Sequence, residues 1–439
     1  MPLLPPDHPE RLSLADEVHA RPPEPLETPS RATYVAVLMA HDDRVREVGH
    51  LIDLCARHLV SGPAEGATHF STSLGALRLK WERHGEFSGY TFFTSGCSPE
   101  PFSEPPTSLL PPGWLALIPG VTMVAAHAQL VPAGATPPDA ALLARHFGEN
   151  IAVGGEIGGG AGLAFTDFRI HGDGCARFLV IDRSFTPRQA GRMLQRLFEI
   201  EAYRMMALLA LPIARRQSAR IVAIERSLAA LTDSIADDRA RDHAANPTSD
   251  DEALLQQLTR LAAEVESGLA ASQFRFGACR AYFELVTRRI AELREKRLDG
   301  VQTIEEFMAR RFTPAVATCA TVSQRLHDLS ERVAQASALL STRVEIARER
   351  QNQALLGSMD RRAKLQLRLQ QTVEGLSVAA IVYYVAGLAG YIAKAAKAGG
   401  ARIDPDIAVA IVIPVVAVLL IAVLRRARHH AAGATHPFD

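Results

Sequence analysis

Apolar residues are spread unevenly along this chain, and two runs near its end contain them almost without interruption. The stretch VEGLSVAAIVYYVAGLAGYIAKAAK carries no charge between Glu374 and Lys394, and a second apolar run covers Ile407 to Leu424. A hydrocarbon core about 30 Å thick needs roughly 20 helical residues, with about 17 as the lower limit. Residues 376–392 and 407–424 therefore predict a C-terminal two-helix transmembrane hairpin, and a buried hairpin in a soluble protein is the alternative.

The composition of both runs favours lipid over a protein core. Neither run has the polar stripe of a surface helix. Pro414, inside the second run, is better tolerated in lipid than in a soluble helix. The first run holds residues that suit a membrane interface, close packing between helices or, in a channel, a pore lining: Tyr383, Tyr384, Gly387, Gly390 and Tyr391.

The first part of the chain has a different pattern, in which short apolar runs alternate with turn residues. Residues 1–30 predict an extended arm, and residues 31–185 predict a mixed α/β (or α+β) domain. Residues 42–59 predict a helix with Val45, Val48, Ile52 and Cys55 on one face, and residues 140–147 predict another. The predicted strands are 32–40, two within 75–93 around a turn at His84 and Gly85, 121–131, 159–170 and 175–182.

From residue 186 onward the pattern is helical. Thr186, Pro187 and Gln189 form a capping-box sequence that opens a helical hairpin region over residues 186–302, and Pro212 is expected to kink the first helix. The polar residues 233–253 predict a connection between two helices, with Ser249 and Glu252 as the capping box of the second.

Residues 303–375 predict one long stalk helix that leads toward the first span. Its apolar residues alternate spacings of four and three, which is a heptad seam. Such a seam indicates either a helix bundle within the chain or a stalk that associates with other copies. The seam consists of Val322, Leu326, Leu329, Val333, Ala336 and Leu340.

Charge sets the expected location. The 48 Lys and Arg residues balance the 48 Asp and Glu residues, so no global field favours nucleic acid. The flanks outside the two spans carry more positive charge than the loop between them, which predicts that both termini, including the tail of residues 425–439, are cytoplasmic. The N-terminus has no secretory signal pattern, and five scattered cysteines indicate free thiols in a reducing compartment.

Two clusters of polar residues are candidates for ligand binding or for docking of the arm. Glu17, His19 and Arg21 share one face if the segment is extended, and would bind an anion or relay a proton; an arm held by ion pairs is the simpler interpretation. Glu82 and His84 share a face of a strand, but two ligands are a weak metal site, and a hairpin with an exposed polar edge is the simpler interpretation.

The remaining motifs point to no reaction. The glycine-rich stretch VGGEIGGGAG lacks the Gly-Lys-Ser/Thr of a phosphate loop and predicts a turn or a bent strand. The sequence holds no Gly-x-Ser-x-Gly or His-Glu-x-x-His motif, so we predict no catalytic residues, metal or cofactor.

Several segments resemble a bacterial family of uncharacterised membrane-anchored proteins. These are LADEVHARP, LRLKWERHGEFSGYTFF, FEIEAYRMMALLALP and RRAKLQLRLQQTVEGLSVAAIVYYVAGL, together with the last apolar run. The resemblance implies anchoring in the inner membrane and no known activity. A cytosolic domain that binds a partner or serves as a scaffold is the resulting hypothesis.

The order of segments is also similar to that of CorA-type magnesium channels. That resemblance implies a homo-oligomer, a homopentamer in those channels, in which the first span lines a pore and ends in Gly-Met-Asn. Here the corresponding residues are Gly387 to Tyr391 and the following loop is cationic, which disfavours a divalent cation. An ion channel or transporter that associates through the stalk and spans is the alternative hypothesis.

Overall fold

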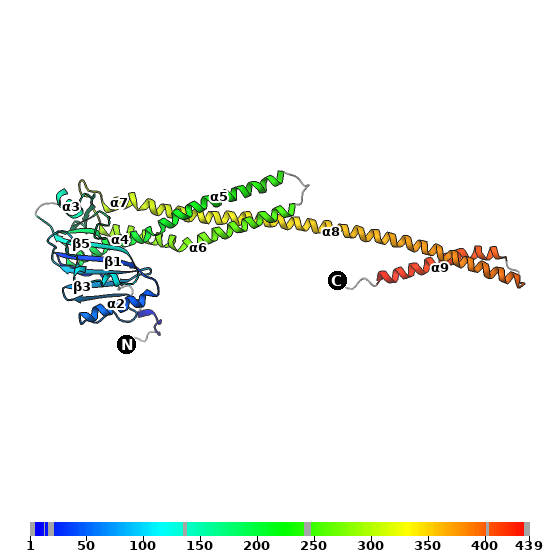
Figure 1. Cartoon of the computed structure of the whole chain (residues 1–439), viewed down its shortest axis with the longest axis horizontal. Helices are drawn as coiled ribbons and strands as arrows, with labels where there is room; N and C mark the ends of the chain where they lie inside the picture. Colours follow the sequence, from blue (N-terminus) through cyan, green and yellow to red (C-terminus); the bar gives the residue numbers. More distant parts are fainter. Residues whose placement is uncertain are drawn as a thin grey trace. The chain divides into compact units, whose positions relative to one another are not determined.

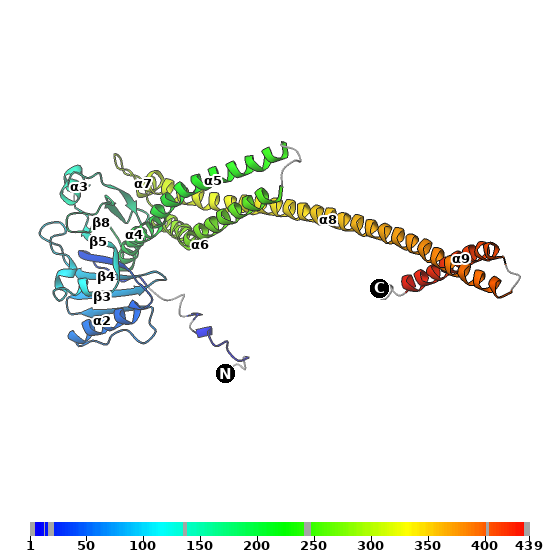
Figure 2. The ribbon, with the colours of Figure 1, turned by 45° about the vertical axis from the view of Figure 1, so that its right-hand side comes forward.

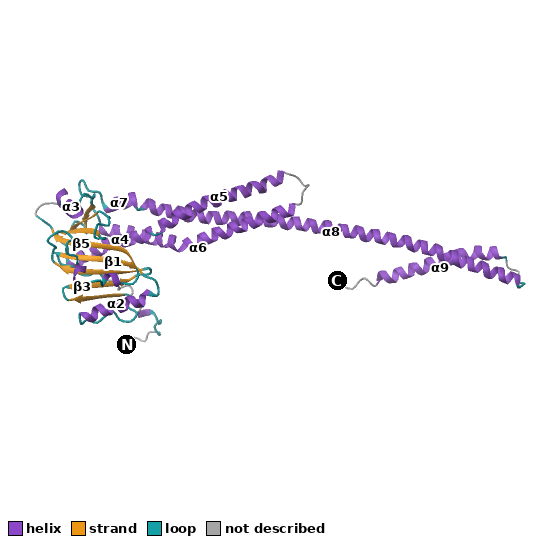
Figure 3. Ribbon diagram, in the orientation of Figure 1, coloured by secondary structure: helices purple, strands orange, loops and turns teal. Residues whose placement is uncertain are grey.

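The computed structural model describes residues 5–12, 14–15, 22–134, 138–240, 247–400 and 404–433. The chain forms two compact units, which are described separately. The first comprises Met1–Asp242 and Leu254–Ala338, and the second comprises His243–Ala253 and Leu339–Asp439. Figure 3 shows that the strands belong to the first unit and that the rest of the chain is mainly helical.

The first unit is built on a mixed eight-stranded sheet with the order β2-β3-β4-β1-β5-β8-β7-β6. Neighbouring strands are antiparallel except β5 and β8, which are parallel. The expectation of an α/β or α+β domain is therefore confirmed (Figure 1). The strands are β1 (Ser30–Leu38), β2 (His69–Leu74), β3 (Leu77–Arg83), β4 (Phe87–Ser95), β5 (Val121–Pro132), β6 (Val153–Ile157), β7 (Gly162–Thr166) and β8 (Ala176–Asp182).

Strand β2 is absent from the sequence prediction, and β6 lies in a stretch that the sequence left open as a turn or a bent strand. The edge strand β2 alternates short polar residues with only two large apolar ones, so it has little hydrophobic signal. The glycine-rich stretch forms β6 and the turn into β7, which confirms the bent-strand interpretation. The predicted strand over 159–170 is accordingly shorter, because Gly158, Gly159 and Gly160 take positive φ values of 64°, 76° and 94° in the turn.

Helix α2 (Asp43–Arg57) covers one face of the sheet, next to β3 and β4 (Figure 2). Its predicted apolar face is right for Cys55, which is buried, and for Val48, which packs against the core, but wrong for Val45 and Ile52, which are 82% and 44% exposed. The buried face carries Glu47, Leu51, Leu54 and Cys55. The helix is rotated toward Glu47 because Trp81 Nε1 and Tyr90 OH each donate a 2.8 Å hydrogen bond to Glu47 Oε1.

Helix α4 (Pro187–Leu208) covers the opposite face of the sheet. The capping box of Thr186 and Gln189 is confirmed. The ring of Phe198 stacks on Tyr34 of β1 with centroids 5.1 Å apart and meets Phe178 of β8 edge-on. Because side chains alternate across a strand, Tyr34 faces α4 while its neighbour Val35 packs with the α2 side of the core.

The predicted kink at Pro212 is a full interruption: α4 ends at Leu208 and α5 (Ala210–Ala240) begins two residues later. The predicted polar connection over 233–253 was too long, because α5 continues to Ala240 and α6 (Pro247–Leu293) has already begun at Pro247. Ser249 therefore lies inside α6 and does not cap it.

The short helix α7 (Ile304–Arg311) begins at the capping box of Thr303 and Glu306, and α8 (Thr313–Ala398) follows it as one continuous helix. The heptad seam in α8 is buried within the single chain, with only Ala336 half-buried. In the first unit, Arg325 pairs with Glu225 of α5 at 2.8 Å and Ser330 donates to Glu266 of α6. The structure thus supports the intramolecular bundle (Figures 1 and 2).

In the second unit, the end of α8 lies beside α9 (Pro405–Gly433) (Figure 2). A Cβ atom added to Gly390 would lie 3.2 Å from Val409 Cγ2, so this glycine marks the close approach of the two helices. Both helices are long and apolar enough to cross a membrane, and only 11% and 0% of their most apolar windows are buried. Because a soluble core helix would be mostly buried, the two apolar helices indicate membrane association.

Candidate functional site

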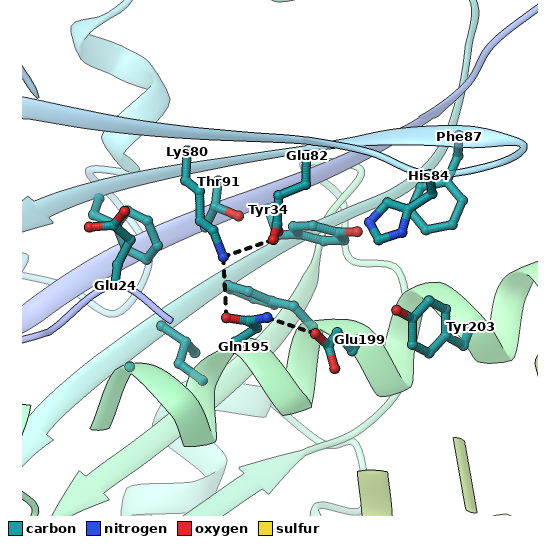
Figure 4. A pocket seen from close by; sticks show the side chains of 14 residues that line it. Glu24, Tyr34, Lys80, Glu82, His84, Phe87, Thr91, Gln195, Glu199 and Tyr203 are labelled. Atoms are coloured by element: carbon teal, nitrogen blue, oxygen red, sulfur yellow. Dashed lines mark hydrogen bonds and ion pairs between the residues drawn. The ribbon is translucent and has the colours of Figure 1, made fainter. Parts of the chain in front are cut away.

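A layer of polar side chains lies between the sheet and α4. In β3, Lys80 and Glu82 are two residues apart and point to the same face, where Lys80 Nζ lies 2.9 Å from Glu82 Oε1. Lys80 Nζ also donates a 3.2 Å hydrogen bond to Gln195 Oε1 of α4, and Gln195 Nε2 donates a 2.8 Å bond to Glu199 Oε1 (Figure 4). Because residues four apart share a helix face, Gln195, Glu199 and Tyr203 all point toward the sheet.

The expectation of an exposed polar edge at the β3–β4 hairpin is wrong. The side chain of Glu82 is only 10% exposed and that of Lys80 only 5%. His84 is half-buried and stacks on Phe87 with ring centroids 4.3 Å apart. The structure does place Glu82 and His84 in one lining, as their spacing predicted, but that lining is internal.

The layer is too tight to hold a substrate. Its free volume is about 20 Å³, close to the minimum that accommodates one water molecule. Burial raises the pKa of Tyr34 well above its usual value, and burial together with Glu199 raises the pKa of Tyr203. Both phenols therefore stay neutral at physiological pH. The arrangement fixes α4 to the sheet through charge-assisted hydrogen bonds.

The polar layer continues into a chain of ion pairs that reaches the outer side of α4. Arg289 of α6 pairs with Glu199, and its Nη1 lies 3.0 Å from Glu292 Oε1. Glu292 in turn accepts from Arg196 Nε at 2.9 Å. Lys80, Arg289 and Arg196 are thus matched one for one by Glu82, Glu199 and Glu292.

The outer ion pairs of this network, Arg289–Glu199 and Arg196–Glu292, form one wall of an open groove of about 600 Å³, a volume in the usual range for ligand sites. The groove lies between α4, the end of α6 and the segment Pro22–Leu26 of the arm. Leu26 N donates to Pro187 O at 2.9 Å, which fixes that segment to the start of α4. The lining residues are Pro22, Pro23, Pro25, Arg188, Arg192, Gln195, Arg196, Glu199, Arg289 and Glu292.

The comparison with protein families becomes informative once these features are known. Residues 6–431 match the family described as "Protein of unknown function (DUF3422)". The chain belongs to this family. Since the match extends from the arm to α9, the sheet, the groove, the bundle and both apolar helices are parts of one family unit.

The other comparisons add little to membership of the DUF3422 family. No curated protein matches the chain. Among solved structures, the chain is similar to "structure of the full-length CmaX protein", with 12% identity over 70% of this chain and 89% of that one. The TM-score of 0.18 is too low to indicate a shared fold.

The structure locates the predicted site residues unevenly. Glu17, His19 and Arg21 lie outside the described residues, so their predicted cluster stays a prediction. Tyr383, Tyr384 and Tyr391 are about three-quarters exposed on the apolar part of α8. Within the described parts of the chain, no group of three or more His, Cys, Asp and Glu side chains is placed to hold a metal ion.

Sequence reasoning missed the groove and its arginines. A usable signal existed, because Arg188, Arg192 and Arg196 recur every four residues on α4. That spacing indicates a basic helix face. It gives no indication of the α6 residues almost a hundred positions later that complete the groove.

Proposed function

We propose that this DUF3422 protein is a membrane-anchored binding or scaffold protein, whose sheet domain recognises a ligand or partner and whose two apolar helices hold it in the bacterial inner membrane. The observation that carries the proposal is the exposed apolar surface of the second unit. Leu388, Ile411 and Val418 are between 59% and 68% exposed. Lipid supplies the surroundings that such side chains need.

Charge distribution supports cytoplasmic termini and a cytosolic sheet domain. Lys394 and Lys397 belong to the loop side, where Asp404 and Asp406 offset part of their charge. The flanks outside the spans hold more cations, which favours retention on the cytoplasmic side. Those flanking cations are Arg361, Arg362, Lys364, Arg368, Arg425, Arg426 and Arg428.

A CorA-like oligomeric channel is the second candidate. One observation favours it: no atom lies within 4 Å of a Cβ built on Gly387. The first span is therefore uncovered at this position, and another copy of the chain could pack against it there. Because the heptad seam is already buried within the chain, such copies would associate through the spans. The cationic residues Lys394 and Lys397 at the adjacent end oppose cation entry, and we therefore favour the anchored binding protein.

Extraction of membranes tests the anchor. The full chain is expected to stay in the pellet through high salt and alkaline carbonate, and to be released only by detergent. The double variant Leu388→Arg/Val418→Arg, which places one charge in each span, should be released, because each arginine costs about 2.5–3.5 kcal/mol near the centre of a span. The matched control is Leu355→Arg/Leu365→Arg, two exposed leucines of α8 before the span, which should stay in the pellet. Release of the unaltered chain by carbonate would contradict the proposal.

A further inference from the structure

The groove between α4, α6 and the arm contains positive charge that no carboxylate of the described residues neutralises. Its inner wall is balanced, since Arg196 and Arg289 are paired with Glu292 and Glu199. Arg188 and Arg192 are both exposed, and no carboxylate of the described residues lies within ion-pair distance of either. The groove therefore carries a local excess of two positive charges.

A second hollow extends this basic surface. It has a volume of about 360 Å³ and shares Arg192, Arg196 and Glu292 with the groove. It adds the exposed Arg294, which likewise has no ion pair with a carboxylate in the part of the chain that is described. Among the described residues, three arginines that form no ion pair with a carboxylate thus line this depression, which consists of the groove and the adjoining hollow that shares Arg192 with it.

We infer that this depression binds a phosphate ester, with Arg188 and Arg192 contacting the phosphoryl group. One turn of helix separates these two side chains, so a single phosphoryl or diphosphoryl group can contact both. The planar guanidinium donates paired hydrogen bonds in a geometry that suits phosphate oxygens.

The other walls indicate the rest of the ligand. Pro22, Pro23 and Pro25 offer an apolar rim with little conformational freedom, which suits a less polar ligand body. At the inner end, Arg289 and Arg196 are already paired with Glu199 and Glu292, so that end offers little attraction to a second anionic group. A ligand with its charge at one end and a less polar body fits both features. This inference rests on the proposed function, because it names the ligand class of the proposed binding domain.

The test is isothermal titration of the purified full chain in neutral detergent with inorganic pyrophosphate. Arg188→Ala/Arg192→Ala should weaken binding about tenfold for each charge-assisted contact removed, and added salt should weaken binding to the unaltered chain. Arg188→Lys/Arg192→Lys should retain part of the affinity, because the charge stays and the paired geometry is lost. The matched control is Arg215→Ala/Arg216→Ala, two exposed arginines of α5 outside the groove.

A second experiment distinguishes a soluble ester from a lipid headgroup. The pyrophosphate titration is repeated with the chain in phosphatidylcholine nanodiscs with and without phosphatidic acid, and the unfolding stability of the protein is compared between the two kinds of nanodisc. Pyrophosphate binding that only the groove variant loses supports a soluble ester. If phosphatidic acid stabilises the unaltered chain but not Arg188→Ala/Arg192→Ala, and pyrophosphate does not bind, the same groove is assigned to a lipid headgroup. No binding of either probe, or equal loss in the α5 control, overturns the inference. Carbonate extraction of Arg188→Ala/Arg192→Ala tests anchoring independently of ligand binding. If this variant stays in the membrane pellet, the anchor is supported whether or not the groove binds a phosphate ester.

Discussion

Replacing Gly191 by alanine tests how the arm is attached to α4. A Cβ atom on Gly191 would lie 1.7 Å from the carbonyl oxygen of Glu24, a separation that two non-bonded atoms cannot adopt. The segment around Glu24 therefore has to move away. Two stabilising features go with it: the burial of Leu26, now 2% exposed, and the hydrogen bond from Leu26 N to Pro187 O.

The two losses can be weighed against one gain. Exposing a leucine costs about 1.5–3 kcal/mol, and a lost hydrogen bond costs about 0.5–1.5 kcal/mol. Alanine in place of glycine inside a helix returns about 1 kcal/mol. Gly191→Ala should therefore lower the free energy of unfolding by about 1–3.5 kcal/mol, although the same change in an unobstructed helix raises it.

The assay is urea unfolding in detergent followed by tryptophan fluorescence. Both tryptophans, Trp81 and Trp114, are buried in the first unit and report on that unit. Gly277→Ala is the matched control, because this exposed glycine of α6 has no atom within 4 Å of a built Cβ; it should stabilise by about 1 kcal/mol. Hydrogen exchange at the Leu26 amide should accelerate in Gly191→Ala only. If Gly191→Ala is as stable as the control and keeps Leu26 protected, the packing of the arm is refuted.

Three further predictions concern buried groups. Lys80→Met and Glu82→Leu should each cost about 3–5 kcal/mol, while the double variant should cost far less than their sum in a double-mutant unfolding cycle; additive losses would contradict the ion pair. Burial lowers the pKa of His127, so the stability that the neutral ring contributes is complete above the unfolded pKa of about 6.5 and is lost as the pH falls from there through the lower folded pKa; His127→Gln should flatten the stability curve below about pH 6.5, and an unchanged slope would argue against it. Cys97 is exposed and should react with a maleimide in the native protein, whereas Cys175, whose thiol pKa burial raises to about 11, should react only after unfolding; equal rates would contradict the assigned burial.

Local pattern was enough to predict most elements of the first unit. β1, β5 and β8 follow from short β-branched runs, and α4 follows from its capping box. The edge strand β2 escaped because its backbone pairing with β3 needs no hydrophobic side chains. Prediction from the hydrophobic pattern depends on side chains, whereas β2 is held mainly by main-chain hydrogen bonds.

The errors at Glu47 and Glu82 share one physical cause, which is a contact between residues distant in sequence. Glu47 is turned inward by donors 34 and 43 positions later, and no property of its own helix reveals them. Glu82 is buried because α4, more than a hundred residues further on, brings Gln195 to Lys80. A charged residue looks exposed in a sequence until its partner is known.

The candidate site was visible only in part. The spacing of Arg188 and Arg192 is a property of α4 alone and can be read from the sequence. That no described carboxylate pairs with them, and that Arg289 and Pro22 supply walls, are properties of the folded unit. Pro22 and Arg289 line the same groove but are more than 250 residues apart in the chain, so no local sequence pattern predicts that they meet.

The most direct test of the account is the side of the membrane on which each unit lies. In intact spheroplasts treated with a membrane-impermeant maleimide, the native thiol of Cys97 should stay unlabelled until the cells are lysed. A thiol placed at the exposed end of the first apolar helix by Ala398→Cys should be labelled from outside without lysis. Labelling of Cys97 in intact spheroplasts, or protection of the Ala398→Cys thiol until lysis, would contradict an anchored protein with its sheet domain in the cytosol.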